Sequence, residues 1–560
     1  MKEQGCKVHF HGEIASFLDE HIHENKDIED ILARKYLKDK VALFNSTRGA
    51  FSLAIEDYSQ GELLLVRDKI GEIPLYYSIQ SGKVYWGNRI CDILRQSKDP
   101  FELNEDVIHE YLVFRYISST NTMFKNIHEV LPAHFVKVHL NTGHVEEHAY
   151  WDIPYPPADQ QFPADKVTIV DRIEGILKKS IENGLSHHLR HGVMSSGGVD
   201  SSLIIAIASG VHKEKLKTCF IGFDGYESDR SSDAEAVAQW YNTDHSTFYL
   251  NAEQYACGLP DTIRLHEEPL NHPGHVGRAL FNKHNQRDID CLLLGEGVDT
   301  MFCGSKAYPL IKIAYQNNYL RGLTKRIFEN ISVNYIPNKY KRHYRMIRDA
   351  FTMEPADYLI YSLAVNDPDE VEKLMVEESK LDYLEYYRSF LHEYNKRNIH
   401  LKFLRLNQHP FMVEVLNSEF KFGSEYNIQN YYPFLDVDLV SYANHIPYNL
   451  RSRGLTGKYI IKKLAERYFP RSFVYKRKEG FGVPLKKYFD DPKGMGRYYD
   501  LLRDKRTSER GIFDSNRLAE LVDKTRHCTH ASDELFEGLI WSIINLELWC
   551  RIYLDQHGCA

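Results

Sequence analysis

The sequence of 560 residues lacks several features that mark particular classes of protein. No stretch reaches the roughly 18 apolar residues that a membrane-spanning helix needs. The first residues, MKEQGCKVHFHGEI, lack the apolar centre and cleavage site of a signal peptide. Lys and Arg number 70 against 78 Asp and Glu, and the net charge of −8 excludes an overall basic nucleic-acid binder. We therefore expect a cytoplasmic protein that binds neither membrane nor nucleic acid.

Cysteine pairing motifs are also lacking. The nine cysteines form no CxxC pair, so neither a zinc site nor a redox motif is indicated. An odd number of cysteines in a chain of this length favours reduced thiols over a disulfide framework. With 43% hydrophobic and 26% charged residues, the composition is that of an ordinary globular protein. The length suits two large domains or roughly three to four smaller ones.

Short segments with strand character follow one another through the first part of the chain. PLYYSIQSGKVYWGN is predicted to form a hairpin that turns near Ser81 and Gly82, and another turn is predicted at residues 141–143. A polar, proline-rich stretch at residues 154–165 then opens a different pattern. We place the boundary there and expect domains at residues 1–155 and 156–560.

Beyond this boundary, short apolar strands alternate with helices. The predicted strands are HGVMS, KTCFIGF, STFYL and DCLLL. Such alternation is typical of an α/β fold with a parallel sheet covered on both faces. Residues 305–410 are mostly helical in pattern and rich in Tyr, Lys and Arg. This composition favours a solvated helical layer with aromatic core positions over an RNA-binding platform.

The segment Ser195 to Ser202, SSGGVDSS, follows a buried strand and opens a helix. Backbone N–H groups and the dipole at a helix N-terminus attract anions, and two glycines let the backbone approach a ligand. Ser196 and Ser201 add hydroxyl donors, as does Ser202, whereas Asp200 would repel a phosphate unless Mg²⁺ lay between them. The segment predicts a phosphate site other than the GxxxxGK[ST] loop. A flexible Ser/Gly turn is the alternative, which the flanking elements disfavour.

A second glycine-rich segment, Leu294 to Asp299, follows another predicted strand. Ligands of open α/β sheets bind outside the carboxyl ends of the strands, so both segments should face one crevice. Asp200 and Asp299 would then share a magnesium ion, and Glu296 would act as a base or an electrostatic partner. The alternative is that Glu296 and Asp299 only cap the next helix.

A third segment, RKEGFGVP at residues 477–484, places a basic pair beside glycines. Lys478 would supply a mobile positive charge that closes over a polyphosphate. Taken alone, however, this run is better explained as solvated surface charge.

These segments, together and in this order, resemble the motifs of the asparagine synthetase family. SGGVDS resembles the family's pyrophosphate loop SGG(L/V/I)DS, and LLGEGVD resembles (S/T)GEG(S/A)DE. YPFLD resembles the PFLD box, and GKYIIKKLAERYFP with RKEGFGVPL resembles the closing lysine motifs. LVRDKIGEIPLYY and HGEI are similar to motifs of the family's first domain, so the resemblance covers nearly the whole chain.

The resemblance implies an α/β protein with two parts. The first would be an N-terminal nucleophile (Ntn) hydrolase-like α+β sandwich, which in the family hydrolyses glutamine with a cysteine directly after the initiator methionine. The second would be an ATP-pyrophosphatase (PP-loop) domain with a parallel sheet and helical additions. There ATP and Mg²⁺ would activate a carboxylate as an acyl-adenylate, and ammonia would displace AMP. Adenylation is needed because a carboxylate is a poor electrophile.

The same resemblance assigns roles to individual residues. The nucleotide and pyrophosphate contacts would be Met194, Ser196, Gly197, Gly198, Asp200, Ser201, Ile221, Leu294 and Gly295. Met194 and Ile221, at the ends of two strands, would bracket adenosine. Glu296 would serve the adenylate and the attack of ammonia, while Asp200 and Asp299 would hold the metal. Lys478 would contact phosphate or the intermediate, with Lys458 as a further catalytic candidate.

The N-terminus departs from the family pattern. Lys2 stands where the nucleophilic Cys is expected, and Gly5-Cys6-Lys7 does not match Cys-Gly-Ile. Glu13 and Asp27 match glutamine-site positions, but His11 replaces the usual Asn. We expect a truncated or degenerate glutaminase-like domain and no hydrolysis of glutamine by this chain.

The synthetase part departs as well. Thr300 replaces the acid that follows Asp299, and NIQNY at residues 427–431 replaces the GxExR before the PFLD box. Losing that Arg removes a planar fork suited to a second carboxylate, which argues against aspartate as the substrate. β-Lactam synthetases and lasso-peptide cyclases resemble this family and join an internal amine, but they tend to replace the glutamate that Glu296 retains.

The sequence therefore predicts an ATP-dependent amide-forming ligase that acts on a small-molecule or peptide carboxylate and takes ammonia. A lactam- or macrolactam-forming cyclase is the alternative. The intact motifs disfavour a catalytically silent scaffold, and the acidic charge without a CxxC pair disfavours a tRNA-modifying enzyme. A second copy of the chain, or a separate glutaminase or pathway protein, is left open as a partner.

Overall fold

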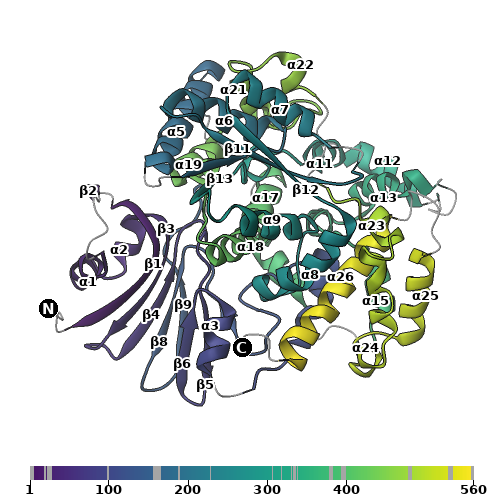
Figure 1. Ribbon diagram of the computed structural model, residues 1–560, viewed down its shortest axis with the longest axis horizontal. Helices are drawn as coiled ribbons and strands as arrows, with labels where there is room; N and C mark the ends of the chain where they lie inside the picture. Colours follow the sequence, from purple (N-terminus) through teal and green to yellow (C-terminus); the bar gives the residue numbers. More distant parts are fainter. Residues whose placement is uncertain are drawn as a thin grey trace.

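The computed structural model describes residues 5–17, 20–21, 28–97, 100–155, 165–186, 190–226, 229–305, 307–316, 318–329, 331, 336, 338–377, 382–392, 399–476, 482–526 and 534–556. Figure 1 shows two joined parts, a β-rich part that carries the N-terminus and a larger part in which helices surround a second sheet. Within the described ranges, no helix combines the length and the apolar character needed to span a bilayer.

The first part is built on a six-stranded sheet in the order β2-β1-β3-β4-β8-β9, in which all neighbours run antiparallel. Its strands are β1 (Cys6–Phe17), β2 (Glu20–His21), β3 (Thr47–Asp57), β4 (Glu62–Arg67), β8 (His134–His139) and β9 (Val145–Ala149). Helices α1 (Ile28–Asp39) and α2 (Ala42–Ser46) cover one face, where Leu32, Tyr36 and Phe44 are buried in a hydrophobic cluster.

A smaller antiparallel sheet covers the other face. It consists of β5 (Tyr76–Gln80), β6 (Lys83–Gly87) and β7 (His128–Glu129) in the order β6-β5-β7. The predicted hairpin turn is confirmed, with φ of 50° at Ser81 and 75° at Gly82. A helical layer and two antiparallel sheets therefore form the α+β sandwich that was expected, while its Ntn-specific features stay a prediction.

Cysteine chemistry differs in one place from the expectation of reduced thiols. Six cysteines of the described residues are free thiols, namely Cys6, Cys219, Cys257, Cys291, Cys303 and Cys550. Cys91, in α3 (Ile90–Gln96), is instead disulfide-bonded. Spacing could not predict this bond, because no short motif contains it.

The second part contains a five-stranded parallel sheet in the order β12-β11-β10-β13-β14. Its strands are β10 (His191–Met194), β11 (Lys217–Phe223), β12 (Asp244–Leu250), β13 (Cys291–Leu293) and β14 (Gln429–Tyr431). The first four confirm the predicted strands. The fifth was missed because its residues, Gln-Asn-Tyr, are polar and too few to show a periodicity.

Helices cover both faces of this sheet (Figure 1). On one face lie α5 (Lys166–Ser186), α6 (Val199–Val211) and α7 (Ser231–Trp240), and on the other lie α8 (Ala252–His266), α9 (Gly274–Asn285) and α18 (Met412–Glu425). The chain adds strands outward from β10 to β12 and then returns to place β13 on the other side of β10. The gap between the ends of β10 and β13 is therefore the topological switch point, where open α/β sheets bind ligands.

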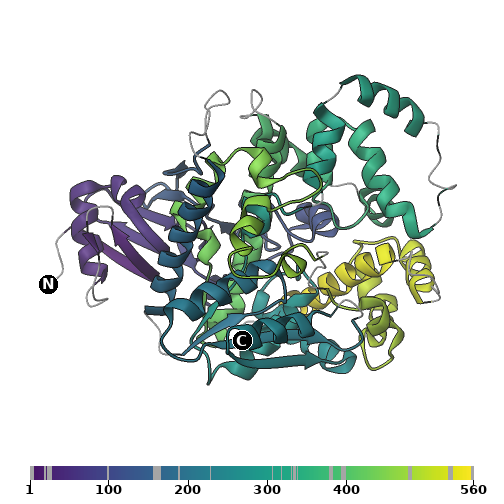
Figure 2. The same ribbon diagram turned by 90° about the horizontal axis from the view of Figure 1, so that it is seen from above.

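The connection from β13 to β14 is mostly helical, as predicted for residues 305–410. Its helices before α18 are α10 (Val298–Met301), α11 (Ala307–Gln316), α12 (Asn318–Glu329), α13 (Asn338–Thr352), α14 (Pro355–Tyr361), α15 (Pro368–Leu374), α16 (Tyr383–His392) and α17 (Ile399–Leu406). Figure 2 shows α11 to α13, in teal-green, standing out from the rest of the molecule.

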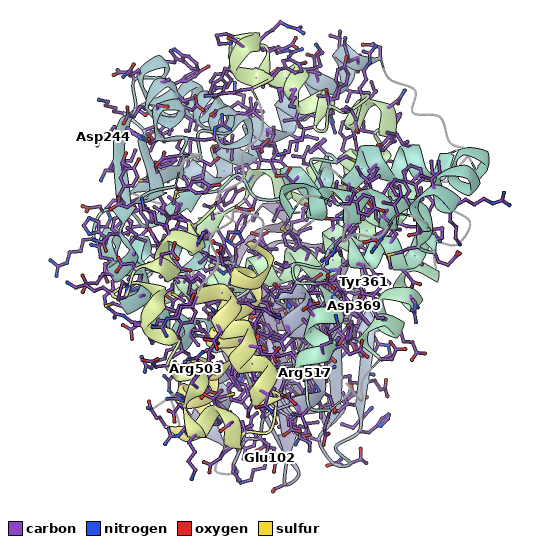
Figure 3. All side chains as sticks on the ribbon, turned by 90° about the vertical axis from the view of Figure 1, so that its right-hand side faces the viewer. Glu102, Asp244, Tyr361, Asp369, Arg503 and Arg517 are labelled. Atoms are coloured by element: carbon purple, nitrogen blue, oxygen red, sulfur yellow. The ribbon has the colours of Figure 1, made fainter. Side chains whose placement is uncertain are left out.

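The C-terminal helices close the fold. They are α19 (Val437–His445), α20 (Tyr448–Arg451), α21 (Tyr459–Ala465), α22 (Arg471–Val474), α23 (Leu485–Asp490), α24 (Lys505–Glu509), α25 (Ser515–Arg526) and α26 (Glu534–Cys550). In α26, Trp541 and Trp549 are fully buried. Arg517 of α25 donates to the carbonyl of Lys373 in α15, and Figure 3 labels Arg517 together with Asp369, which belongs to α15.

Candidate functional site

The loop between β10 and α6 is held in one conformation by its own hydroxyls. Ser201 Oγ accepts from the backbone N–H of Ser196 at 3.0 Å, and Ser196 Oγ accepts from the N–H of Gly198 at 3.3 Å. Gly197 has a φ of +66°, which side chains other than glycine rarely adopt. The loop is thus a hydrogen-bonded turn at a helix N-terminus, and these bonds disfavour the alternative of a flexible Ser/Gly turn.

Two polar atoms of this loop are buried without a hydrogen-bond partner among the described residues: Ser195 Oγ and Asp200 Oδ1. Leaving a buried polar group unpaired costs about 1–3 kcal/mol. Such orphaned atoms are uncommon in native interiors and need an explanation. At the carboxyl end of a central parallel strand, a bound ligand is the explanation that fits.

The second loop, between β13 and α10, touches the first. A Cβ built on Gly295 would lie 3.3 Å from the backbone nitrogen of Ser201. Gly297, at a φ of 90°, is the N-cap of α10, and no side chain caps that helix. Glu296 and Asp299 are therefore not helix caps, so the alternative raised by the sequence is wrong. The two loops meet at the switch point, as expected from their positions after neighbouring strands.

Lys458 joins the two loops. It precedes α21 in a left-handed conformation, with a φ of 55°. Its Nζ donates to Asp200 Oδ2 and lies 2.8 Å from Asp299 Oδ1. Burial alone would lower the pKa of Lys458, but the two carboxylates raise it above its ordinary value. The two predicted metal ligands thus come together, and Lys458, only 4% exposed, lies between them.

Two glycines make this approach possible. A Cβ on Gly304 would lie 1.8 Å from Asp299 Oδ1 and 2.4 Å from Lys458 Cε. A Cβ on Gly457 would lie 2.4 Å from the carbonyl oxygen of Cys303. All three distances are shorter than real contacts. A side chain at position 304 would displace Asp299 and Lys458, and one at position 457 would collide with the backbone.

Glu296 is a carboxyl group with a raised pKa. Its side chain is exposed to solvent, and the charges of Glu419 and Asp299 act on it. Desolvation, reinforced by the charges of Glu419 and Asp299, raises the pKa of Glu296 to about 7. A general base works best when its pKa lies near the operating pH.

A magnesium ion fits the carboxylates at this site. Asp200 has one engaged and one orphaned oxygen, and Asp299 faces the same ammonium group. Among the described residues, no three His, Cys, Asp or Glu side chains cluster closely enough to hold a metal. Mg²⁺ is commonly held by one or two carboxylates together with substrate phosphates, so these two aspartates would complete its shell with ATP.

A buried ion pair lies behind the site and was not foreseen from the sequence. Arg278 of α9 donates to Glu419 at 2.6 Å, to Asn430 at 2.7 Å and to Asn282 at 3.0 Å. These contacts leave Arg278 occupied by protein groups. Isolated residues on α9 and α18 carry no local motif, so only the packing of the two helices could reveal the pair.

The residues that replace the family's missing acid and arginine are also engaged. Thr300 Oγ1 donates to the carbonyl of Gly297 at 2.8 Å, and Thr300 is buried. In β14, Gln429 Nε2 donates to Glu13 Oε2 at 2.9 Å, and the carbonyl of Tyr431 accepts from the N–H of Leu294 at 2.9 Å. This stretch therefore supports the sheet and the junction between the two parts.

The predicted adenosine contacts lie at different depths. Met194 ends β10 and is partly buried, and Leu294 is buried beside it at the end of β13. Ile221 is not at a strand end, because β11 continues to Phe223. It is buried against α9, where a Cβ on Gly277 would lie 3.2 Å from Ile221 Cγ2. Lys478 and Asp27 lie outside the described residues.

The expected glutamine-site residues make contacts within the protein. Glu13 of β1 accepts from Gln429, and the ring of His11 meets that of Phe420 edge-on at 5.6 Å. Cys6 is buried in β1, with its Sγ 3.8 Å from the carbonyl oxygen of Ala33. The N-terminal sandwich therefore contacts the parallel-sheet part through Glu13 and His11, the residues expected to belong to a glutamine site.

Two family models match the chain. The model described as asparagine synthase matches residues 172–551, and the model described as a glutamine amidotransferase domain matches residues 8–151. The first match includes both strand-end loops, Lys458 and the helical connection between β13 and β14. The second match covers most of the N-terminal sandwich.

Curated relatives share low sequence identity over long stretches. Asparagine synthetase [glutamine-hydrolyzing] 1 of Bacillus subtilis is 22% identical over 541 residues, which cover 95% of this chain and 82% of that protein. Asparagine synthetase [glutamine-hydrolyzing] 3 of the same organism is 21% identical, over 90% of this chain and 78% of that protein. Amidase chyE of Penicillium rubens is 25% identical over 50% of this chain and 43% of that protein.

Proposed function

The chain belongs to the asparagine synthase family, and we propose that it is an ATP-dependent amide ligase that activates a carboxylate as an acyl-adenylate. Pyrophosphate leaves in that step, and ammonia then displaces AMP to form an amide. The observation that carries the proposal is the meeting of the two strand-end loops, with Asp200, Lys458 and Asp299 in contact and Glu296 beside them.

The residues divide the chemistry between the two loops. Backbone N–H groups and hydroxyls after β10 would hold the pyrophosphate part of ATP, as helix N-termini hold anions. Mg²⁺ on Asp200 and Asp299 would neutralise charge on the departing pyrophosphate. Lys458, held between the same two carboxylates, would present its ammonium group to the phosphates. Glu296, ionised above about pH 7, would accept the proton that the attacking nitrogen loses.

The nitrogen source in this proposal is free ammonia. Glu13, which would bind glutamine, already accepts a hydrogen bond from Gln429, and Cys6 is buried within a strand. Neither arrangement supports hydrolysis of glutamine by the described residues. Ammonia would come from solution or from a separate glutaminase.

The acyl substrate is proposed to differ from aspartate. Recognition of a second carboxylate calls for a free guanidinium fork. Arg278, the arginine behind Glu296, is already occupied by Glu419, Asn282 and Asn430. This observation favours a second candidate function, in which an amine within the same substrate closes a lactam or macrolactam ring.

The test is pyrophosphate release by the purified full chain with Mg-ATP. Aspartate plus ammonium, aspartate plus glutamine, and ATP alone are compared, followed by a panel of other carboxylates. Release with a carboxylate and ammonium, but not with glutamine, supports the proposal. Incorporation of ¹⁵N from ammonium distinguishes amide formation from ring closure, which loses water and takes up no label. Absence of release with every carboxylate, in protein that binds ATP, would contradict the proposed ligase activity.

A further inference from the structure

The segment after β11 lies against the loop after β10. A Cβ built on Gly197 would lie 2.6 Å from the carbonyl oxygen of Arg230 and 2.9 Å from its Cβ. A Cβ on Gly198 would lie 3.8 Å from Arg230 Nη1. The guanidinium group of Arg230 is therefore beside the glycines of the proposed pyrophosphate loop. No local motif in the sequence marks Arg230, although its place after a parallel strand agrees with the binding of ligands at strand ends.

Asp233 fixes the orientation of this arginine. Asp233 Oδ2 accepts from Nε of Arg230 at 2.9 Å and lies 2.9 Å from Nη2. The same carboxylate accepts from Lys476 Nζ at 2.7 and 2.8 Å. The side chains of Arg230 and Asp233 are only 13% and 14% exposed. Two of the three guanidinium nitrogens are thus turned toward Asp233, and Nη1 is the one nearest Gly198.

The charges at the two ends of the loop have opposite signs. Near Asp200, two carboxylates share one lysine, which leaves a net negative charge suited to a divalent cation. Near Gly197 and Gly198, two cations share the carboxylate of Asp233, an arrangement suited to an anion. The carboxylate of Asp229, one residue before Arg230, is taken up by the N–H of Ser231 and the hydroxyl of Tyr249. Partly buried charges act more strongly than solvated ones, because the local dielectric constant is lower.

We propose that Arg230 is a pyrophosphate-binding residue, with Nη1 as its donor to the β- and γ-phosphates of ATP and Asp233 as its positioning residue. The inference rests on the proposed function, because it names a further contact of the same site. During adenylation the carboxylate oxygen bonds to the α-phosphorus, and the bond from that phosphorus to the bridging oxygen breaks. Pyrophosphate leaves with the electron pair, no proton is transferred, and Arg230 stabilises the added charge.

The proposal predicts that substitution of Arg230 weakens the binding of ligands with β- and γ-phosphates more than the binding of AMP. Arg230→Met should weaken the binding of Mg-ATP and of pyrophosphate about 10- to 100-fold, the loss expected for a charge-assisted hydrogen bond. AMP lacks the β- and γ-phosphates, so its affinity should change less than about twofold. Arg230→Lys should give an intermediate loss, since it keeps the charge but not the planar fork. Arg190→Met is the control. Arg190 directly precedes β10 and pairs with Asp290, so it lies at the opposite end of that strand from the loop after β10.

Isothermal titration of the full chain with Mg-ATP, pyrophosphate and AMP tests this, with thermal unfolding of each variant. Selective loss of ATP and pyrophosphate binding in Arg230→Met or Arg230→Lys is the expected result. Equal loss for AMP would overturn the proposal, because it would show a structural role, and so would unchanged pyrophosphate affinity. If the unaltered chain bound ATP but released no pyrophosphate with any carboxylate, the proposed ligase function would fail while the Arg230 contact could still be measured.

Discussion

The segments expected to bind glutamine and ATP differ in how their polar groups are paired. In the first, Glu13 accepts a hydrogen bond from Gln429 and His11 meets Phe420, so both side chains serve the junction between the two parts. In the second, Ser195 Oγ and Asp200 Oδ1 are buried without a partner among the described residues. Orphaned groups are costly, and a bound ligand is one way to supply their partner. The contrast favours the loop after β10 as the candidate functional site.

The largest expected effect comes from removing the charge of Asp200, in the loop after β10. Asp200→Asn keeps the shape of the side chain but removes the charge shared by Lys458 and the proposed metal. We expect pyrophosphate release to fall about 100- to 1,000-fold, as when one preorganised electrostatic group is lost. The matched control is Asp244→Asn, at the start of β12 on the edge of the molecule in Figure 3. Unchanged turnover in Asp200→Asn would remove Asp200 from the chemistry.

A second large effect tests the close approach around Lys458. In Gly304→Ala the added Cβ would collide with Asp299 and with Lys458, so the lysine and the carboxylate must separate. Because displacements near 1 Å can cost about 100-fold in rate, we expect a loss of that size in pyrophosphate release. Gly322→Ala in α12 meets no neighbour within 4 Å and should keep full activity. Equal activity of the two variants would contradict the geometry.

A moderate effect concerns the pH dependence that Glu296 imposes. Its raised pKa of about 7 means that the base form is lost as the pH falls through neutrality. Turnover, corrected for the concentration of free ammonia, should therefore rise with pH and level off above about 7 to 8. Glu296→Gln should abolish this rise and lower turnover about 100-fold, within the usual range for a general base. The check is a pH–rate profile of both proteins, and an identical profile in the variant would exclude Glu296 as the titrating group.

The smallest expected effect concerns the hydrogen bond between Gln429 and Glu13 at the junction of the two parts. Gln429→Ala removes one hydrogen bond to Glu13, and we expect a loss of about 1 kcal/mol in unfolding free energy. Gln429→Glu places two carboxylates together and should cost more. Urea unfolding followed by circular dichroism measures both, and glutamate release from glutamine should stay at background in each. Glutamine hydrolysis appearing in Gln429→Ala would show that the junction merely masks a working glutamine site.

Much of the fold could be predicted because its patterns are local. The hairpin at Ser81 and Gly82 and the four apolar parallel strands follow from short-range periodicity and turn chemistry. β14 could not be found in this way, since three polar residues show no period. Its pairing depends on β13, more than a hundred residues earlier, through contacts such as the N–H of Leu294 with Tyr431.

The residues of the candidate site could be predicted where they belong to motifs at strand ends. They could not be predicted where the packing of distant elements determines which groups a side chain contacts. The positions of the glycine-rich loops after two strands predicted that Asp200 and Asp299 would lie together, and both contact Lys458. The family resemblance ranked Lys458 below Lys478, and a lysine before a helix carries no signal for what its Nζ will reach. Arg230 and Arg278 were missed for the same reason, since their partners come from other elements.

The position of the site between β10 and β13 also bears on how such a protein can change over time. The phosphate-facing loops are completed before residue 305, and the long helical excursion from α11 to α17 returns only to add the edge strand β14. Substitutions within that excursion can therefore accumulate while the sheet and the two loops of the candidate site stay unaltered. The architecture separates a preserved centre from a segment that is free to change, which is the condition under which one scaffold can diversify.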